Sequence, residues 1–354
     1  MVHRKILFFC DAPESISPST QVNARQFRDF LYEHGWDLEI LPPASSRTTE
    51  LLKKVKGLHW LYCRLLLPML RRWQFTTKLG QSHIVIVHKT ISQIGYPPNL
   101  ESKLRKKHNA IIFNFDDAIN EAGFDYLDKR IELSDAVWVG NEQLKRYSEG
   151  FSKNVNLIRS AVDTDYYSAK STYNLHPFPR LIWCGTPYSF KYLELLEKPL
   201  SNLSKSLDFK ILLVSREKFQ FCDPKIQCEW IPYSKERELE SLKESDVALM
   251  PLTDGVYERA KENYKVKMYL SIGLPTICSP VGINNMYIKE NENGLFATSE
   301  KEWEKQIKKL LYDEGLRERI GTAGRTYIEQ NYSIPIIGEQ IIELFESLLN
   351  RARK

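Results

Sequence analysis

The sequence lacks the glycine-rich loops by which most nucleotide-binding enzymes are recognised. No G-x-G-x-x-G motif occurs, and the loop after the first apolar run, residues 11–20, contains no glycine. This argues against an oxidoreductase that binds a nicotinamide or flavin dinucleotide. No G-x-x-x-x-G-K-[ST] motif occurs either, which excludes the usual P-loop nucleotidases.

The sequence also lacks the patterns of a metal centre or of an activated nucleophile. Its 6 cysteines form no C-x-x-C pair, so neither a zinc site nor a disulfide framework is expected. No His/Asp/Glu cluster has metal-ligand spacing and no G-x-S-x-G elbow is present. We therefore expect no metal and no cofactor, and reduced thiols in a cytoplasmic protein.

Long apolar runs and a strong charge imbalance are absent as well. No run reaches the length of a membrane span, and the first apolar run is too short for a signal peptide. The net charge of +5 is too small to indicate a nucleic-acid partner. We expect a cytoplasmic protein that is soluble or peripheral at the inner face of the plasma membrane.

What the sequence does contain is a regular alternation of apolar strands and amphipathic helices. Strands that are apolar on both faces indicate parallel sheets covered on both sides. Their number favours two doubly wound α/β domains rather than one sheet. The predicted strands are residues 5–10, 38–41, 83–88, 110–115, 136–140, 155–158, 180–185, 210–215, 228–232, 246–251 and 275–280.

The polar, proline-bearing residues 166–179 lie between two strand–helix series and suit a domain boundary. The prediction is an N-terminal doubly wound domain over residues 1–167 and a C-terminal doubly wound domain over residues 168–332. Residues 333–354 form a helix that we expect to pack back on the N-terminal domain.

Polar residues and glycines follow most of the predicted strands. In a doubly wound sheet the carboxyl ends of the strands bind ligands, so two such edges that face each other would form a cleft. The residues that stand at these ends include His88, Lys89, Asp116, Asp117, Asn141, Gly185, Thr186, Val281 and Gly282.

The most informative segment is residues 246–282, which predicts a strand, a polar loop, a helix from about Glu262, and a second strand. Lys261 and Lys265 lie one helical turn apart beside the expected helix N-terminus. Two ammonium groups near the positive end of a helix favour a doubly negative ligand, such as a diphosphate.

In the N-terminal half, one carboxylate of the pair Asp116–Asp117 can cap the helix that follows. The second is then available to orient or deprotonate a hydroxyl group. His88 is either a catalytic residue or a hydrogen-bonded histidine at a strand end.

Residues 51–80 contain basic and apolar side chains but no Asp or Glu. This composition suits an anionic membrane surface. It equally suits a helix whose apolar stripe packs on the sheet while its lysines face water, and Pro68 would kink or divide that helix.

Several motifs together resemble glycosyltransferase family 4, the retaining, sugar-nucleotide-dependent enzymes of the GT-B fold. In the C-terminal half these are LIWCGTPYSFKYLELL, AKENYKVKMYLSIGLPTICSPVGINNMYIKENENGLFA and EWEKQIKKLLYDEGLRERIGTAGRTYIEQNYS. In the N-terminal half they are FDDAI, DAVWVGNEQL and NVNLIRSAVDTDYY. The resemblance implies two facing Rossmann-like domains and transfer of a sugar from a nucleotide donor without a required metal.

The resemblance also implies roles for individual residues. Lys261, Lys265 and Glu262 would bind the donor, with Lys265 also stabilising the leaving phosphate. On the acceptor side the resemblance implies roles for His88, Lys89, Asp116, Asp117 and Asn141. The further donor-site residues would be Gly185, Thr186, Val281, Gly282 and Ile283.

The chain departs from the family where many members have two glutamates, one at the donor sugar and one at the ribose. The aligned positions are Ala260 and Met268, and a methionine cannot accept a hydrogen bond from a ribose hydroxyl. Either Glu258 or Glu262 takes over this contact, or the ribose is held in another way, or the affinity for the donor is reduced.

The sequence therefore predicts a glycosyltransferase of the hexosyltransferase class that acts in cell-surface polysaccharide or glycolipid synthesis. Its partners would be a nucleotide sugar and a glycan or lipid-linked acceptor. The alternatives are a sugar-nucleotide epimerase of the same fold and a non-catalytic relative that binds sugar nucleotides.

Overall fold

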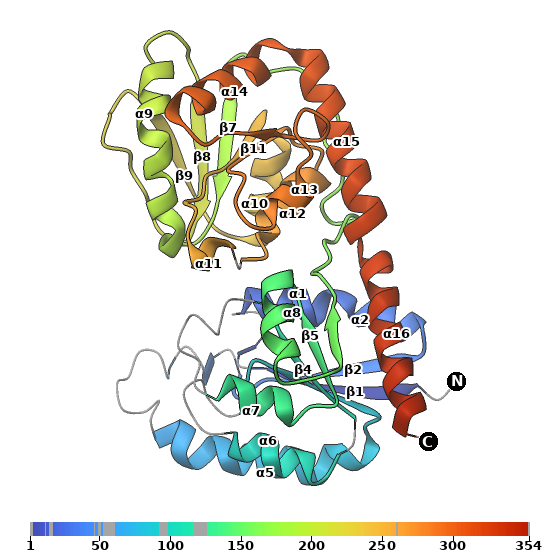
Figure 1. The fold of residues 1–354 in the computed structure, drawn as a ribbon. Helices are drawn as coiled ribbons and strands as arrows, with labels where there is room; N and C mark the ends of the chain where they lie inside the picture. The colour runs from blue at the N-terminus through green and yellow to red at the C-terminus, as the bar shows by residue number, and fades with distance from the viewer. Residues whose placement is uncertain are drawn as a thin grey trace. The chain divides into compact units, whose positions relative to one another are not determined.

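The computed structural model describes residues 3–10, 12–13, 17–45, 47–48, 51, 61–91, 98–108, 110–116, 126–259 and 261–352. The chain divides into two compact units (Figure 1). Unit 1 comprises Met1–Ala161 with Ile334–Lys354, and unit 2 comprises Val162–Ser333.

Unit 1 is built on a six-stranded parallel sheet of order β2-β1-β3-β4-β5-β6. The strands are β1 Arg4–Phe9, β2 Trp36–Leu41, β3 Ile84–His88, β4 Ile111–Phe115, β5 Ala136–Val139 and β6 Val155–Leu157. The helices are α1 Pro18–Asn23, η1 Arg25–Phe27, α2 Arg28–Glu33, η2 Tyr62–Leu66, α5 Leu67–Lys78, η3 Leu79–Gln81, α6 Asn99–Arg105, α7 Leu127–Glu132, α8 Glu142–Glu149 and α16 Ile334–Ala352.

Helices cover both faces of this sheet. Phe75 of α5, Leu104 of α6 and Ile131 of α7 pack with alternate strand residues such as Phe9 in one buried cluster, and Figure 1 shows α5 and α6 side by side along this face. On the other face α2 and α16 lie together, and the Trp36 and Phe345 rings are 5.1 Å apart.

Unit 2 has a second six-stranded parallel sheet, of order β12-β11-β10-β7-β8-β9. Its strands are β7 Arg180–Cys184, β8 Lys210–Ser215, β9 Gln227–Pro232, β10 Val247–Met250, β11 Thr276–Cys278 and β12 Leu295–Phe296. Its helices are η4 Pro187–Tyr192, α9 Glu194–Leu203, α10 Lys235–Lys243, α11 Val256–Arg259, α12 Tyr264–Ser271, α13 Asn284–Tyr287, α14 Glu300–Tyr312 and α15 Glu314–Tyr332.

The prediction of two doubly wound parallel α/β sheets is confirmed, and each of the eleven predicted strands is present. The sequence reading missed β12, because Leu295–Phe296 is too short to show a periodic pattern. The order of strands reverses between β1 and β3 in unit 1 and between β7 and β10 in unit 2. Such switch points are where doubly wound sheets bind ligands.

The division between the units falls after Ala161, before the predicted boundary region of residues 166–179. That region packs on unit 2: Tyr167 is buried with its hydroxyl 3.1 Å from Glu238, and the Lys170 amide donates to the Ile272 carbonyl. A polar composition therefore did not mark a linker here. The helix at residues 334–352 belongs with unit 1, where Arg4 pairs with Glu346.

Candidate functional site

The predicted donor residues of unit 2 gather at the switch point of its sheet. Gly185 and Thr186 follow β7 directly, while the loop that carries Lys261 follows β10 and α11. Ser279 to Gly282 follow β11, the neighbour of β10. Because the strands are parallel, all these loops leave the same edge of the sheet.

The helix after β10 begins later than predicted. Asn263 has a left-handed backbone (φ 48°), and α12 starts at Tyr264. Lys265 therefore lies in the first turn of the helix, whereas Lys261 lies in the loop before it. The predicted helix start at about Glu262 was wrong, because left-handed Asn263 interrupts the helical path between the two lysines.

Lys265 and Lys261 nevertheless influence each other electrostatically. Lys265 is half-buried, and its ammonium lies 4.7 Å from the centroid of the Trp183 ring. Burial and the positive charge of Lys261 lower the pKa of Lys265 to about 8, while Cys184 and Glu238 act in the opposite direction. Because burial and Lys261 disfavour the charged form of Lys265, an anion that binds here would stabilise that form.

Lys261 lies among three tyrosine rings. Its ammonium is 4.9 Å from the Tyr192 ring centroid, 5.0 Å from that of Tyr257 and 5.9 Å from that of Tyr188. Cation–π contacts of this kind hold a lysine head group while leaving its positive charge in place.

The two glutamates that were expected to replace the missing pair are both engaged with other residues. Glu262 is buried and pairs with Lys267, a fully buried lysine, across 2.9 Å. Glu258 is buried, accepts a hydrogen bond from the Tyr192 hydroxyl and pairs with Lys191 at 3.3 Å. These contacts stabilise the loop that carries Lys261.

The loop after β11 requires glycine at its centre. Gly282 has φ 56°, and a Cβ atom there would stand 2.7 Å from the Arg259 carbonyl oxygen. The flanking side chains of Val281 and Ile283 are buried. Buried Asn263 donates to Asn284 Oδ1 at 2.9 Å, so this loop and the start of α12 are linked.

Gly185 is constrained in a different way. A Cβ atom on Gly185 would approach the Trp183 ring to 2.2 Å. The Gly185 amide donates to the Val214 carbonyl, and exposed Thr186 precedes η4. The absence of a side chain at Gly185 therefore lets the Trp183 ring, which also contacts Lys265, pack against the backbone after β7.

A carboxylate that the sequence reading did not single out lies near Lys265. Glu238, in the first turn of α10, is buried and accepts a hydrogen bond from the Tyr167 hydroxyl at 3.1 Å. Burial raises the pKa of Glu238 to about 7, against the lowering effects of Tyr167 and Lys265. Met268, by contrast, is buried in α12 with an exposed fraction of 2%.

The edge of the unit 1 sheet brings together a hydrogen-bonded chain of polar side chains. His88, at the end of β3, has its Nδ1 atom 2.6 Å from Asn114 Oδ1 and its Nε2 atom 2.8 Å from Ser19 Oγ. Ser19 donates to Asp116 Oδ2 at 2.5 Å. Because Ser19 has one proton and gives it to Asp116, the geometry fits His88 with protons on both ring nitrogens.

The charged form of Asp116 is strongly stabilised by its neighbours in this hydrogen-bonded group. It accepts from Asn23 Nδ2 at 2.7 Å and pairs with Lys89 at 3.3 Å. Burial opposes its ionisation, but Lys89, His88 and the hydrogen bonds from Ser19 and Asn23 hold the pKa of Asp116 well below its usual value. Lys89 itself has a left-handed backbone, with φ 62°, which is uncommon for a residue other than glycine.

The structure thus brings His88, Lys89 and Asp116 together, while Asp117 lies outside the described residues. Asn141 follows β5, and its side chain accepts from the Leu144 amide as the N-cap of α8.

Sequence reasoning missed Ser19 and Asn23, whose only signal is their spacing. They lie four residues apart in α1, so both face the same side of the helix. The sequence around Glu238 contains no recognisable motif. Its proximity to Lys265 depends on how α10 packs beside the sheet.

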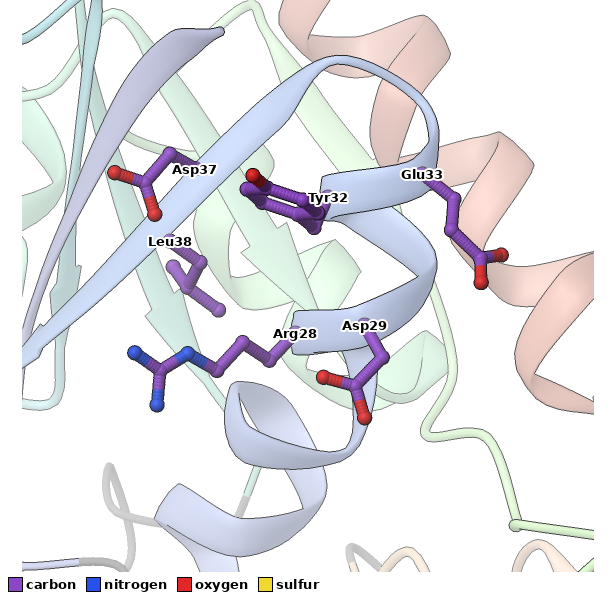
Figure 2. A pocket seen from close by; sticks show the side chains of 6 residues that line it. All are labelled: Arg28, Asp29, Tyr32, Glu33, Asp37 and Leu38. Atoms are coloured by element: carbon purple, nitrogen blue, oxygen red, sulfur yellow. The ribbon is translucent and has the colours of Figure 1, made fainter.

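A pocket of about 310 Å³ lies elsewhere in unit 1. Figure 2 shows the side chains of α2 and β2 that line it. Asp29, Glu33 and Asp37 outnumber Arg28 there, so this pocket is unsuited to a diphosphate, and it contains none of the predicted site residues.

Within the described ranges, no three His, Cys, Asp or Glu side chains gather as metal ligands. In the same part of the chain, no helix combines the length and apolar character needed to cross a bilayer.

Comparison with known proteins identifies the class of the C-terminal half. Residues 215–327 match the family model described as glycosyl transferases group 1. This segment contains Lys261, Lys265 and Gly282, whereas Gly185 precedes it. The match supports an enzyme of the glycosyltransferase class. A comparison with curated protein sequences found no match.

Solved structures of glycosyltransferases share the fold over almost the whole chain. Sucrose-phosphate synthase of Thermosynechococcus elongatus is 13% identical with a TM-score of 0.67, over 99% of this chain and 100% of that one. A glycosyltransferase of Rickettsia africae is 16% identical with a TM-score of 0.67, over 99% of both chains. Anabaena HepE, solved with UDP and glucose, is 12% identical with a TM-score of 0.64, over 98% of this chain and 100% of that one. The fold is GT-B.

Proposed function

We propose that this protein is a retaining glycosyltransferase that moves a hexose from a nucleoside diphosphate sugar to a glycan or lipid-linked acceptor. Such an activity belongs to the synthesis of a cell-surface polysaccharide or glycolipid. The observation that carries the proposal is the convergence of Lys261, Lys265 and the Gly185 and Gly282 loops at one sheet edge.

These groups suit a diphosphate for three physical reasons. Burial and the charge of Lys261 lower the pKa of Lys265, so a bound anion would stabilise its charged form. The N-terminus of α12 adds the positive end of a helix dipole. Gly185 and Gly282 let the loops after β7 and β11 turn closely at the sheet edge where these groups lie. Anabaena HepE has been solved with UDP-glucose, which supports a nucleotide sugar as the donor.

In the proposed reaction, the bond between the anomeric carbon and the phosphate oxygen breaks, and its electron pair leaves with the nucleoside diphosphate. The acceptor hydroxyl oxygen bonds to the anomeric carbon from the face that the phosphate leaves, and its proton passes to an oxygen of the departing diphosphate. Lys265 and Lys261 stabilise the negative charge that develops on the leaving phosphate, an effect worth 10²- to 10³-fold in rate for one well-placed donor.

Glu238 is our candidate for the carboxylate that binds a donor hydroxyl in place of the residue at Met268. It is near enough to Lys265 to influence the charge of that residue. Glu258 and Glu262 are paired with Lys191 and Lys267, respectively. A carboxylate with a raised pKa gains from a hydroxyl donor, because that hydrogen bond stabilises its charged form.

On the acceptor side, we propose that Lys89 and Asp116 bind and orient the acceptor hydroxyl. His88 is a positioning residue in this scheme, because it reaches Asp116 through Ser19. We assign no step of the proposed reaction to Asn141 or Asp117.

Binding of nucleotide sugars tests the proposal. A panel that includes UDP-glucose is titrated into wild-type protein, Lys265→Ala and Lys305→Ala, an exposed lysine of the same unit. A ligand at a hundred times its dissociation constant stabilises the wild type by about 2.7 kcal/mol. We expect this stabilisation in the wild type and Lys305→Ala and its loss in Lys265→Ala. Equal stabilisation of all three proteins would contradict the proposal.

A further inference from the structure

The helical residues 61–78 of unit 1 have an outward face made of large apolar side chains. Leu61, Leu65, Met69 and Trp73 recur every four residues, which places them on one side of the helix. Their exposed fractions are 43%, 53%, 69% and 57%, and neighbouring Leu66 is 54% exposed. We call these five residues the outer stripe.

The opposite side of the same helix is fixed to the sheet. Leu67, Arg71, Gln74 and Phe75 are all buried. The Arg71 guanidinium donates to the carbonyl oxygens of Cys10, Leu41 and Ile91 at 3.0–3.1 Å. Arg71 is therefore a structural anchor and not a surface cation, although the sequence places it among the basic residues of the 51–80 segment.

This anchoring determines which face remains exposed. The helix cannot rotate to bury the outer stripe without removing Arg71 from those three carbonyls, which would leave a buried cation and buried acceptors unpaired. Pro68 lies in the first turn of α5, after five residues of π-helix. The helical structure continues through Pro68, and the outer stripe extends on both sides of it.

The charge around the stripe indicates what covers it. Arg64 and Arg72 are exposed beside it, and residues 51–80 contain no Asp or Glu. Lys78 pairs with Glu39, so we do not count it as part of this surface. The outer stripe consists of aliphatic side chains and a tryptophan, arginines flank it, and residues 51–80 contain no acidic residue. This combination matches the interface of an anionic bilayer.

We propose that the outer stripe inserts into the surface of a membrane that contains anionic phospholipids, with Arg64 and Arg72 contacting the head groups. This goes beyond the proposed function and rests on separate residues. The stripe begins near the carboxyl edge of the unit 1 sheet, where Arg71 meets the residues after β1 and β3. His88 and Lys89 lie at the same edge, so the bilayer would hold a lipid-linked acceptor close to them.

Vesicle flotation tests this inference. Wild-type protein is mixed with vesicles of phosphatidylcholine alone or with a quarter phosphatidylglycerol. We expect binding to the anionic vesicles and little to the neutral ones. The triple variant Leu65→Ser/Met69→Ser/Trp73→Ser should lose about tenfold or more of the partition coefficient. Arg72→Ala should lose about fivefold, as for one surface cation.

Tyr312→Ser is the matched control, since Tyr312 is 71% exposed on a helix of unit 2; it should bind vesicles as the wild type does. Equal binding by the triple variant, or no preference for anionic vesicles, would overturn the inference. The inference would also be overturned if the wild type bound no vesicles and instead formed a dimer that the triple substitution converted to a monomer. Nucleotide-sugar binding by the triple variant should be unchanged, so the two proposals fail separately.

Discussion

The ammonium group of Lys265 lies 4.7 Å from the centroid of the Trp183 ring. The same ring fills the space that a side chain on Gly185 would need. Buried Trp183 thus explains both the position of Lys265 and the requirement for glycine at position 185. The candidate donor site is built on this contact at the end of β7.

The pKa of about 8 for Lys265 predicts how donor binding depends on pH. In the unbound protein Lys265 loses its proton as the pH rises through 8, so donor affinity should fall above this value. Lys265→Arg keeps its charge to much higher pH, and its affinity should be flatter between pH 7 and 9. Calorimetry at pH 8.5 in buffers of different ionisation enthalpy should show proton uptake on binding to the wild type. Identical pH profiles for both proteins would contradict this role of Lys265.

Gly282→Ala should weaken both the loop and donor binding. The left-handed backbone and the 2.7 Å approach to the Arg259 carbonyl predict a cost of about 1–3 kcal/mol in the free energy of unfolding. Gly315→Ala is the control, because its Cβ would be 3.7 Å from the nearest atom, and alanine favours a helix. Urea denaturation measures both variants. A Gly282→Ala protein as stable as Gly315→Ala would show that the loop is not constrained as described.

Glu238→Gln should change stability in a defined pH window. The folded pKa of about 7 lies above the ordinary value of 4.5, so the folded state retains a proton that the unfolded chain releases between these values. Stability from this group therefore falls as the pH rises from about 4.5 to 7. Glutamine does not ionise, so the variant should lack this part of the fall, which urea denaturation at pH 5 and pH 7.5 can measure.

The same variant should bind the nucleotide sugar more weakly, by about tenfold, because it loses a charge-assisted hydrogen bond. Undiminished donor affinity in Glu238→Gln would remove Glu238 from the donor site while leaving the stability prediction intact.

Asp116→Asn should be most damaging near neutral pH. The folded pKa of Asp116 is depressed, so the stability that its carboxylate contributes is present above its ordinary pKa and is lost as the pH falls below about 4. At pH 7 the substitution should cost on the order of 3 kcal/mol, since Lys89 loses its buried partner. At pH 3 the difference from the wild type should shrink. Asp29→Asn, at an exposed position of the same unit, should show neither effect.

The strands were predictable from the sequence because each is a short apolar run bounded by polar or glycine residues. Gly282 was found because it follows a recognisable strand, and Lys265 because it stands four residues after Lys261 beside an expected helix start. The start of α12 was misplaced because the left-handed conformation of Asn263 leaves no clear mark in the residue pattern. Likewise, the sequence places Arg71 among the basic residues of its segment, and only packing shows that it is buried.

Glu238 and Ser19 show the limit of sequence reasoning most clearly. Each lies on a helix after a strand, and its importance depends on what the fold brings against it: Lys265 in one case, Asp116 and His88 in the other. No spacing along the chain connects these pairs.

The central claim is tested most directly by following the fate of a bound nucleotide sugar by proton NMR. The nucleotide sugar that binds best is incubated with wild-type protein and with Lys265→Ala. We predict that the wild type releases the nucleoside diphosphate and a sugar whose first-formed anomer has the configuration of the donor. Lys265→Ala should do so at least about a hundredfold more slowly. An inverted anomer, an epimerised nucleotide sugar, or equal turnover by Lys265→Ala would contradict the account.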